Sequence, residues 1–394
     1  MRLYLVGVFM ISSFMVVAQG NDSIIRYENT ADKLLKNNKG FTIGGYGQLD
    51  YNQPISSTTM NNGTLDVHRL VILFGYNFNE RLKFVSEIEY EHVKEVFVEQ
   101  AFLQYKLNDY INLRGGLILI PMGIINEYHE PPTFNGVERP MVDKYIVPTT
   151  WRELGLGISG NIIEASLKYQ LYVVNGFNGY NGSATLDGKN GLRKGRQKGA
   201  DSYISSPNFS GKVEYYGIRG LNLGLSGYFG NTQSTAYNNL DKSDNLAINS
   251  ADSTVIGVSM IGFDLRYQLK GLALRGQLIY SSLDNTTAYN QKLASDLGTN
   301  MIGYYAEVAY DVFSLTKKFK SQLIPFVRYE VYDTHFKVED NIVKNDAYYN
   351  TIITAGISWK INPHVVIKSD YQFYKSNKEN DYSQMFNAGI GLMF

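Results

Sequence analysis

Apolar and polar side chains alternate with a period of two along most of the chain from Phe41 onward. In residues 263–270, for example, apolar and aromatic side chains occupy the odd positions, and Asp, Arg, Gln and Lys occupy the even ones. Successive side chains of a β-strand point to opposite faces, so this pattern predicts strands with one apolar and one charged face. A charge facing lipid at mid-depth costs about 2–4 kcal/mol, which places the charged face inside a closed barrel. The alternative is a soluble sandwich, which at this length is usually split into domains of about 100 residues.

The number of alternating segments is even. Strands are predicted near 41–51, 65–78, 81–92, 95–107, 110–119, 149–159, 162–174, 208–216, 221–230, 254–270, 272–282, 301–313, 321–332, 348–361, 364–375 and 382–394. Every second connector is short, and those between are mostly long, as in barrels with short periplasmic turns and long outer loops. We therefore predict an all-β fold: a transmembrane antiparallel β-barrel of about 16 strands over residues 41–394, with both termini on the periplasmic side.

The two ends of the chain predict its compartment. One parity of the last strand is apolar and ends on Phe394, which is typical of barrels inserted by the outer-membrane assembly machinery. At the other end, Arg2 and an apolar run before Ala18 predict a signal peptide over residues 1–18, the alternative being a retained anchor for which the run is short. Residues 19–40 are predicted to form a short periplasmic segment with a short helix near 31–38. We expect the outer membrane of a Gram-negative bacterium, with its lipid and lipopolysaccharide as neighbours.

One strand breaks the alternation. In the segment 95–107, Glu99 falls on the same parity as Phe97, Ala101 and Leu103. A β-bulge at this point would restore a charged face, because a bulge inserts one extra residue into a strand. A position near the rim of the barrel would also accommodate the carboxylate.

Composition excludes several classes of function. Cys is absent, and 37 Lys plus Arg balance 37 Asp plus Glu, so neither a disulfide framework nor a nucleic-acid partner is predicted. The five His show no metal-ligand spacing, although His68 and His92 would lie close on neighbouring strands. No nucleophile elbow or phosphate-binding loop occurs. We expect no catalytic residue, no metal and no cofactor; an outer-membrane hydrolase and a structural or adhesive barrel are the alternatives to a channel.

Charged residues of the inward parity are the candidates for lining a water-filled channel. They are Lys83, Glu87, Glu89, Arg114, Glu153, Lys168, Arg266, Arg275, Arg328 and Lys368. Because the two signs nearly balance, they predict only a mild ion preference. The simpler interpretation is charge pairs that hydrate and stiffen the wall; the sharper one is opposing acidic and basic stripes that orient a solute.

Two long connectors carry further candidates. Residues 120–148 are too apolar and proline-rich for a solvated loop, and we expect them to fold into the barrel and narrow it, or else to pack across its mouth or against a neighbouring subunit. The constriction candidates are Glu127, Glu130, Glu138, Arg139, Asp143 and Lys144. Residues 193–198 carry four cations, which would form either a cationic vestibule that steers anions or a solvated run that pairs with lipopolysaccharide.

Four glycine-rich segments carry a family resemblance. Residues 43–51, 67–75, 115–123 and 151–157 resemble segments of the phosphate-selective porin O and P family, in the version common among Bacteroidetes-type bacteria. The resemblance implies a sixteen-stranded porin that forms a homotrimer, with an inward third loop and passive diffusion of small hydrophilic solutes or ions, including anions such as phosphate.

Overall fold

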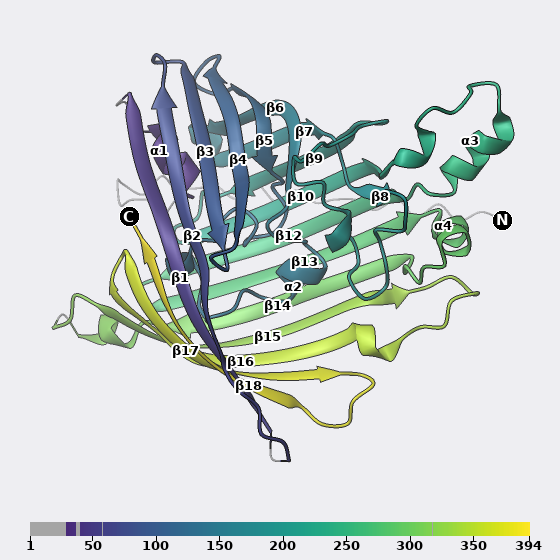
Figure 1. Cartoon of the computed structure of the whole chain (residues 1–394). Coiled ribbons are helices and arrows are strands. Elements are labelled where there is room, and N and C mark those ends of the chain that lie inside the picture. The colour runs from purple at the N-terminus through teal and green to yellow at the C-terminus, as the bar shows by residue number, and fades with distance from the viewer. Residues whose placement is uncertain (1–28, 37–39, 57, 317) are drawn as a thin grey trace, which may run out of the picture.

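The computed structural model describes residues 29–36, 40–56, 58–316 and 318–394, so the predicted signal peptide lies outside the described residues. Sixteen strands form one closed antiparallel barrel, in which each strand pairs with its neighbours in the chain and β1 pairs with β18 to complete the ring (Figure 1). The last residue takes part in this closure, since the backbone N–H of Phe394 donates to the carbonyl oxygen of Gly45 at 2.8 Å. The predicted fold class is confirmed.

The barrel strands follow the predicted segments closely. They are β1 (Phe41–Ile55), β2 (Thr64–Asn77), β3 (Leu82–Glu91), β4 (Glu95–Lys106), β5 (Asn112–Leu119), β6 (Arg152–Ile162), β7 (Leu167–Val174), β9 (Asn208–Tyr215), β10 (Leu221–Asn231), β12 (Gly257–Leu269), β13 (Leu272–Asp284), β14 (Asn300–Tyr310), β15 (Gln322–Lys337), β16 (Tyr349–Asn362), β17 (Val365–Ser376) and β18 (Ser383–Met393). A separate two-stranded sheet joins β8 (Asn178–Tyr180) to β11 (Gln233–Ser234).

One predicted boundary is wrong. The turn predicted at residues 160–161 lies a few residues later, because β6 continues to Ile162 and is followed by the 3-10 turn η2 (Ile163–Ala165). Ser166 then adopts a left-handed conformation with φ of 53°, which reverses the chain into β7. The alternation in residues 163–166 therefore belongs to a turn rather than to the barrel wall.

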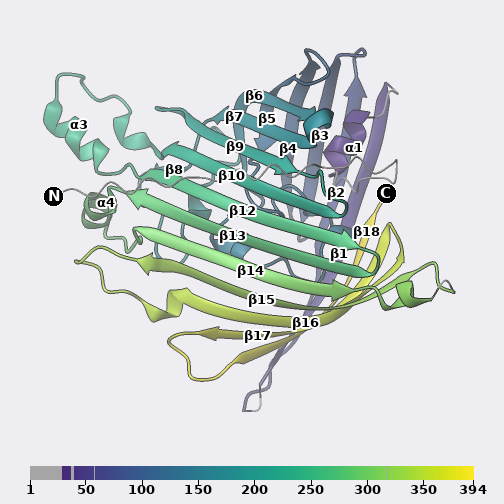
Figure 2. The same cartoon turned by 180° about the vertical axis from the view of Figure 1, so that it is seen from behind.

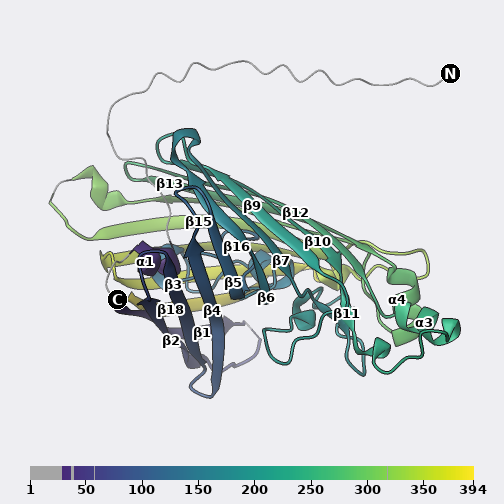
Figure 3. The ribbon, with the colours of Figure 1, turned by 90° about the horizontal axis from the view of Figure 1, so that it is seen from above.

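The two ends of the barrel differ as expected for short turns and long loops. The helices α3 (Asn245–Asp252) and α4 (Thr286–Leu293) lie in long connections at one end (Figures 1 and 2). The helix α1 (Thr30–Lys36) and the C-terminus lie at the opposite end, and Figure 3 shows the same separation from above. Among the described residues, no helix is long and apolar enough to cross a membrane.

The outer face of the barrel wall is apolar and the inner face is charged, as the sequence pattern predicts. On β10 and β12, Leu225 and Phe263 are 56% and 46% exposed on the outer face. On β12 the intervening Asp264 and Arg266 are 0% and 2% exposed and point inward. Apolar side chains thus form the outer surface and charged ones the inner surface, which is the arrangement of a transmembrane barrel.

The β-bulge interpretation of Glu99 is confirmed. In the pairing of β3 with β4, Glu87 lies opposite Gln100 and Ile88 lies opposite Val98, so Glu99 is the extra residue. The bulge turns the Glu99 side chain into the interior, where it is 0% exposed.

The interior holds two further elements. Residues 120–151, here called the constriction loop, contain η1 (Pro131–Thr133) and α2 (Val142–Tyr145), and apolar side chains of this loop join the main hydrophobic core. The helix α1, which was expected in a periplasmic segment, packs against the inner faces of β1, β2 and β3. Ala31 and Leu34 are buried there, so the described part of this segment enters the end of the barrel.

Candidate functional site

The constriction loop crosses the lumen and bonds to the opposite wall. The backbone N–H of Ile124 donates to Gln277 on β13 at 2.7 Å. Further along the loop, Val137 N–H donates to Asp370 on β17 at 2.6 Å, and Met141 N–H donates to Glu330 on β15 at 2.6 Å. The loop therefore folds into the barrel, and the alternatives of packing across the mouth or against another subunit do not describe it.

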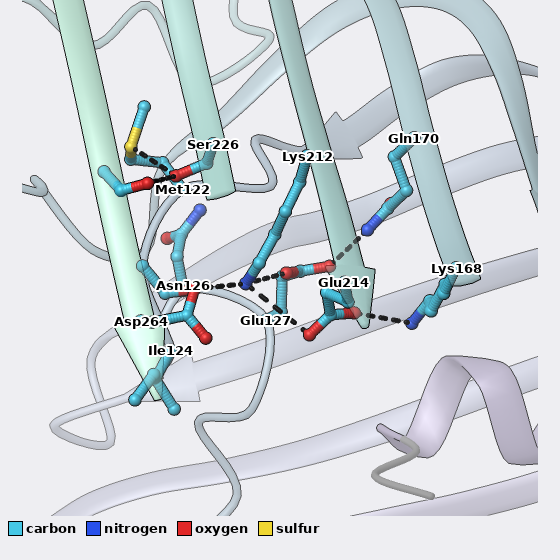
Figure 4. A network of polar contacts seen from close by, with 12 residues as sticks. Met122, Ile124, Asn126, Glu127, Lys168, Gln170, Lys212, Glu214, Ser226 and Asp264 are labelled. Carbon is cyan, nitrogen blue, oxygen red and sulfur yellow. Dashed lines mark hydrogen bonds and ion pairs between the residues drawn. The ribbon is translucent and has the colours of Figure 1, made fainter. Parts of the chain in front are cut away.

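A buried charge cluster clamps the first part of the loop to β9 and β12 (Figure 4). The Lys212 ammonium lies 3.0 Å from Glu127 of the loop and 3.0 Å from Asp264, and it donates to the carbonyl oxygen of Gly123 at 2.9 Å. Arg266 pairs with Glu214 at 2.5 Å. The Lys212 and Arg266 charges are matched by neighbouring carboxylates, as buried charges require.

A second cluster holds the middle of the loop against β13, β14, β15 and β17. Arg328 pairs with Glu307 at 3.3 Å and Glu330 at 3.1 Å, and it also donates to the loop carbonyl oxygen of Asn135 at 3.3 Å. Lys368 lies 3.7 Å from the centre of the Phe134 ring, and Arg275 donates to the carbonyl oxygen of Thr133 at 2.6 Å. These contacts fix the loop in place.

Most of the ten predicted lumen residues serve this clamping or line the opposite end of the barrel. Arg114 and Lys168 line a cavity of about 210 Å³ beside α1, and Arg266 and Arg275 line one of about 220 Å³. Lys83 donates to the carbonyl oxygen of Leu35 in α1. Glu153 accepts from Trp151 and Tyr228, and thereby fixes the start of β6.

Twelve charged side chains line a cavity of about 330 Å³ between the constriction loop, β2–β4, β6 and the connector 175–207. We call it the cationic cavity. Its lining contains seven cations, Arg69, Arg139, Lys144, Arg152, Arg193, Arg196 and Lys198, and five carboxylates, Glu89, Glu91, Glu99, Glu138 and Asp143. Seven against five leaves a formal excess of two positive charges.

Several of these cations have no carboxylate within ion-pair distance in the part of the chain that the structure describes. Arg193 donates to the carbonyl oxygen of Thr149 at 2.8 Å, and Arg196 to that of Pro148 at 3.0 Å. Lys198 lies 4.8 Å from the centre of the Phe97 ring. Burial and the neighbouring Arg193 and Arg152 lower the pKa of Arg196 to about 9, and burial and Arg196 lower that of Lys198. These cations repel one another, and an anion would relieve that repulsion.

The sequence candidates divide accordingly. Of the six constriction candidates, Glu138, Arg139, Asp143 and Lys144 line the cationic cavity. Glu127 and Glu130 instead anchor the loop to Lys212 and to Thr30 of α1. Of the ten wall candidates, Glu89 lines the cationic cavity.

Sequence reasoning missed Arg69 and Arg152 as lining residues. Both lie in the glycine-rich segments 67–75 and 151–157, which carry the family resemblance. The run 193–198 was recognised as cationic, but its fold was not predictable, because Arg193 and Arg196 bond to residues 148–150 through contacts distant in sequence.

An apolar outer face, a polar lumen and a loop folded across it define an outer-membrane channel of the porin class. The family of phosphate-selective porins O and P matches residues 41–393, and the chain belongs to that family. An uncharacterised protein of Aquifex aeolicus (strain VF5) is 34% identical over 384 residues, which is 92% of this chain and 82% of that protein.

Two solved structures show the same fold at low sequence identity. An anion-selective porin from Comamonas acidovorans is 12% identical with a TM-score of 0.58, and the match covers 90% of this chain and 99% of that one. The outer-membrane protein OmpT of Vibrio cholerae in its trimer form is also 12% identical, with a TM-score of 0.52 over 90% of this chain and 100% of that one.

Proposed function

We propose that this outer-membrane porin passes small hydrophilic solutes by passive diffusion with a preference for anions, phosphate among them. The observation that carries the proposal is the cationic cavity, where seven cations face five carboxylates. The balanced charges of the whole chain predict only a mild preference. Ions, however, respond to the charges nearest their path, because the field of distant charges is screened within about 10 Å.

The test is conductance of the refolded protein in planar bilayers under a salt gradient. We expect stepwise openings and a reversal potential of the sign that anion permeation gives. Phosphate added to a chloride solution should reduce the chloride current, because the cavity would hold the more highly charged anion longer. A cation-selective reversal potential would overturn the proposal.

A pair of variants isolates the cavity. Changing Arg139 and Lys198 together to Gln should lower the anion preference several-fold. Lys194→Gln is the matched control, since Lys194 lies in the same basic run but pairs with Asp187 at 3.2 Å and does not line the cavity. Equal effects of the two changes would mean that permeating ions do not pass the cavity.

We further propose that the porin is not an enzyme and assembles as a homotrimer. His68 and His92 do lie close, with ring centres 5.3 Å apart, but each ring faces its own carboxylate, Asp50 or Asp66. A hydrolase activity that is lost in His68→Gln would contradict the first point. The fold shared with an outer-membrane protein solved in a trimer form supports the second, which light scattering in detergent tests. Contacts of the apolar outer face with lipid and lipopolysaccharide, and of the Phe394 strand with the assembly machinery, belong to the same proposal.

A further inference from the structure

His129 of the constriction loop reaches the bulged part of the barrel wall. Its Nε2 lies 3.3 Å from Glu87 Oε1 on β3 and 3.5 Å from Glu99 Oε2 on β4. The three side chains are between 0% and 3% exposed. An imidazole and two carboxylates thus converge where the loop meets the wall.

The hydrogen bonds around this cluster orient its atoms as they would be oriented around a metal ion. His129 Nδ1 lies 3.3 Å from the carbonyl oxygen of Asn126. A carbonyl oxygen only accepts, so Nδ1 carries a proton; when the ring is neutral, its Nε2 lone pair points toward the two carboxylates. Gln100 donates to the other oxygen of Glu87 at 2.6 Å. Metal-bound His and carboxylates are characteristically held by such outer partners.

The hydrogen bonding of Glu99 leaves one of its buried oxygens open to a further partner. Its Oε1 has no hydrogen-bond partner among the described residues, and the nearest cationic atom paired with it, Arg152 Nη1, lies 3.9 Å away. Its Oε2 accepts from Tyr46 at 3.5 Å. A fully buried carboxylate with so few donors is costly unless a positive charge joins it.

We propose that Glu87, Glu99 and His129 form a binding site for a divalent transition metal, best matched by Zn²⁺, which fastens the constriction loop to the barrel wall. Two ligands about 2.0–2.1 Å from a tetrahedral zinc ion lie about 3.3–3.4 Å apart. The separations of 3.3 and 3.5 Å from His129 to the two carboxylates match this geometry. Because Glu99 lines the cationic cavity, water from the cavity can supply the fourth ligand.

A neighbouring cluster of similar composition serves as the internal control. Asp50, His68 and Glu138 also bring three ligand atoms together. There, however, Arg69 Nη2 lies 2.5 Å from His68 Nε2, and His68 Nδ1 lies 3.1 Å from Asp50. Because Arg69 only donates, His68 Nε2 accepts from it and the ring proton of neutral His68 lies on Nδ1, so the ring offers no lone pair to a metal.

The experiment measures zinc binding by the refolded full-length mature porin in detergent after chelator treatment. Elemental analysis after equilibration with excess Zn²⁺ should give one zinc per chain, and Co²⁺ in its place should give a visible absorption spectrum from bound cobalt. His129→Gln and Glu99→Gln should each weaken binding by more than about ten-fold, because each removes one ligand. His68→Gln should bind zinc as the wild type does.

Each other result overturns the proposal. A wild-type barrel that shows the heat-modifiable migration of a folded porin but takes up no stoichiometric zinc would mean that a protonated His129 holds the two carboxylates. Zinc that survives in both His129→Gln and Glu99→Gln, or is lost in His68→Gln, would place the metal elsewhere. If His129→Gln does not fold, Glu99→Gln alone decides, because it preserves the shape of the side chain.

Discussion

The two sides of the lumen use the same residue types in different ways. On the β9–β17 side, Lys212 is paired with three carboxylates and Arg328 with two, and both cations are almost fully buried. At the cationic cavity, Arg193 and Arg196 bond to backbone carbonyls, and Lys198 faces an aromatic ring. A matched buried charge positions the chain and presents little field to a solute, whereas an unmatched charge keeps its field for a passing ion.

Paired and unpaired cations are therefore expected to have different roles in the barrel. A cation on the β9–β17 side should matter for stability and for the position of the loop. A cavity cation without a carboxylate partner, such as Lys198, should matter for ion selectivity and little for stability. A paired cation whose loss changes only selectivity, or a cavity cation whose loss changes only stability, would contradict this assignment.

The largest effect is expected from Lys212→Met. The change leaves Glu127 and Asp264 buried without the ammonium 3.0 Å away, and breaking a buried pair typically costs about 3–5 kcal/mol. The midpoint of thermal or urea unfolding in detergent should fall clearly. Lys242→Met, at an exposed position in an outer connection, is the control. Unchanged unfolding of Lys212→Met would show that the cluster does not hold the loop.

The second-largest effect is expected on ion selectivity at the cationic cavity. Lys198→Glu reverses one charge there and should lower the anion-to-cation permeability ratio by about five-fold, equivalent to about 1 kcal/mol at the path of the ion. Reversal potentials in bilayers measure the ratio. Its unfolding should stay near that of the wild type, because Lys198 has no ion pair among the described residues to lose. A large loss of stability without a change in selectivity would show that Lys198 stabilises the fold and does not act on the permeating ion.

The same contrast explains how far the sequence could predict the molecule. The strands follow from a period of two, which is a local property, and even the irregularity at Glu99 marked a real bulge. The parity predicted charges on the inner face, and Asp264 and Arg266 are buried there. It could not show whether Lys212 forms an ion pair with Glu127, because that depends on a loop residue 85 positions away in sequence.

The lining of the cationic cavity could not be predicted from the sequence for a similar reason. Its lining comes from β2–β4, β6, the constriction loop and residues 193–198, and these meet through contacts that no local pattern encodes. The entry of α1 into the barrel was also beyond prediction, since it depends on Thr30 meeting Glu130 and Asp32 meeting Lys168 at 2.9 Å.

The helix α1 offers a smaller test of a paired charge, that of Asp32 with Lys168 on β7. Asp32→Asn removes the charge that pairs with Lys168, and this partly exposed pair contributes roughly 1 kcal/mol at most. The chain has no Cys, so Leu34→Cys provides a unique buried thiol on α1. Its labelling by a water-soluble reagent should become up to about five-fold faster with Asp32→Asn, because the helix leaves the wall more often. Lys33→Gln, exposed on the same helix, should leave the labelling rate unchanged. Equal acceleration by Lys33→Gln and Asp32→Asn would show that the Asp32–Lys168 pair does not hold the helix against the wall.

The smallest effect is a pH dependence at the cavity. Burial raises the pKa of Asp143 to about 7, so its carboxyl is largely neutral below that pH and ionised above it. Raising the pH from 6 to 8 therefore ionises most of the Asp143 carboxyl, and this group should lower the anion preference by about two-fold, as a unit charge about 10 Å from the ion would give in water. Asp143→Asn should lose this part of the pH dependence. A preference that changes equally in the wild type and in Asp143→Asn would assign the pH dependence to another group and remove Asp143 from the charges that an ion meets.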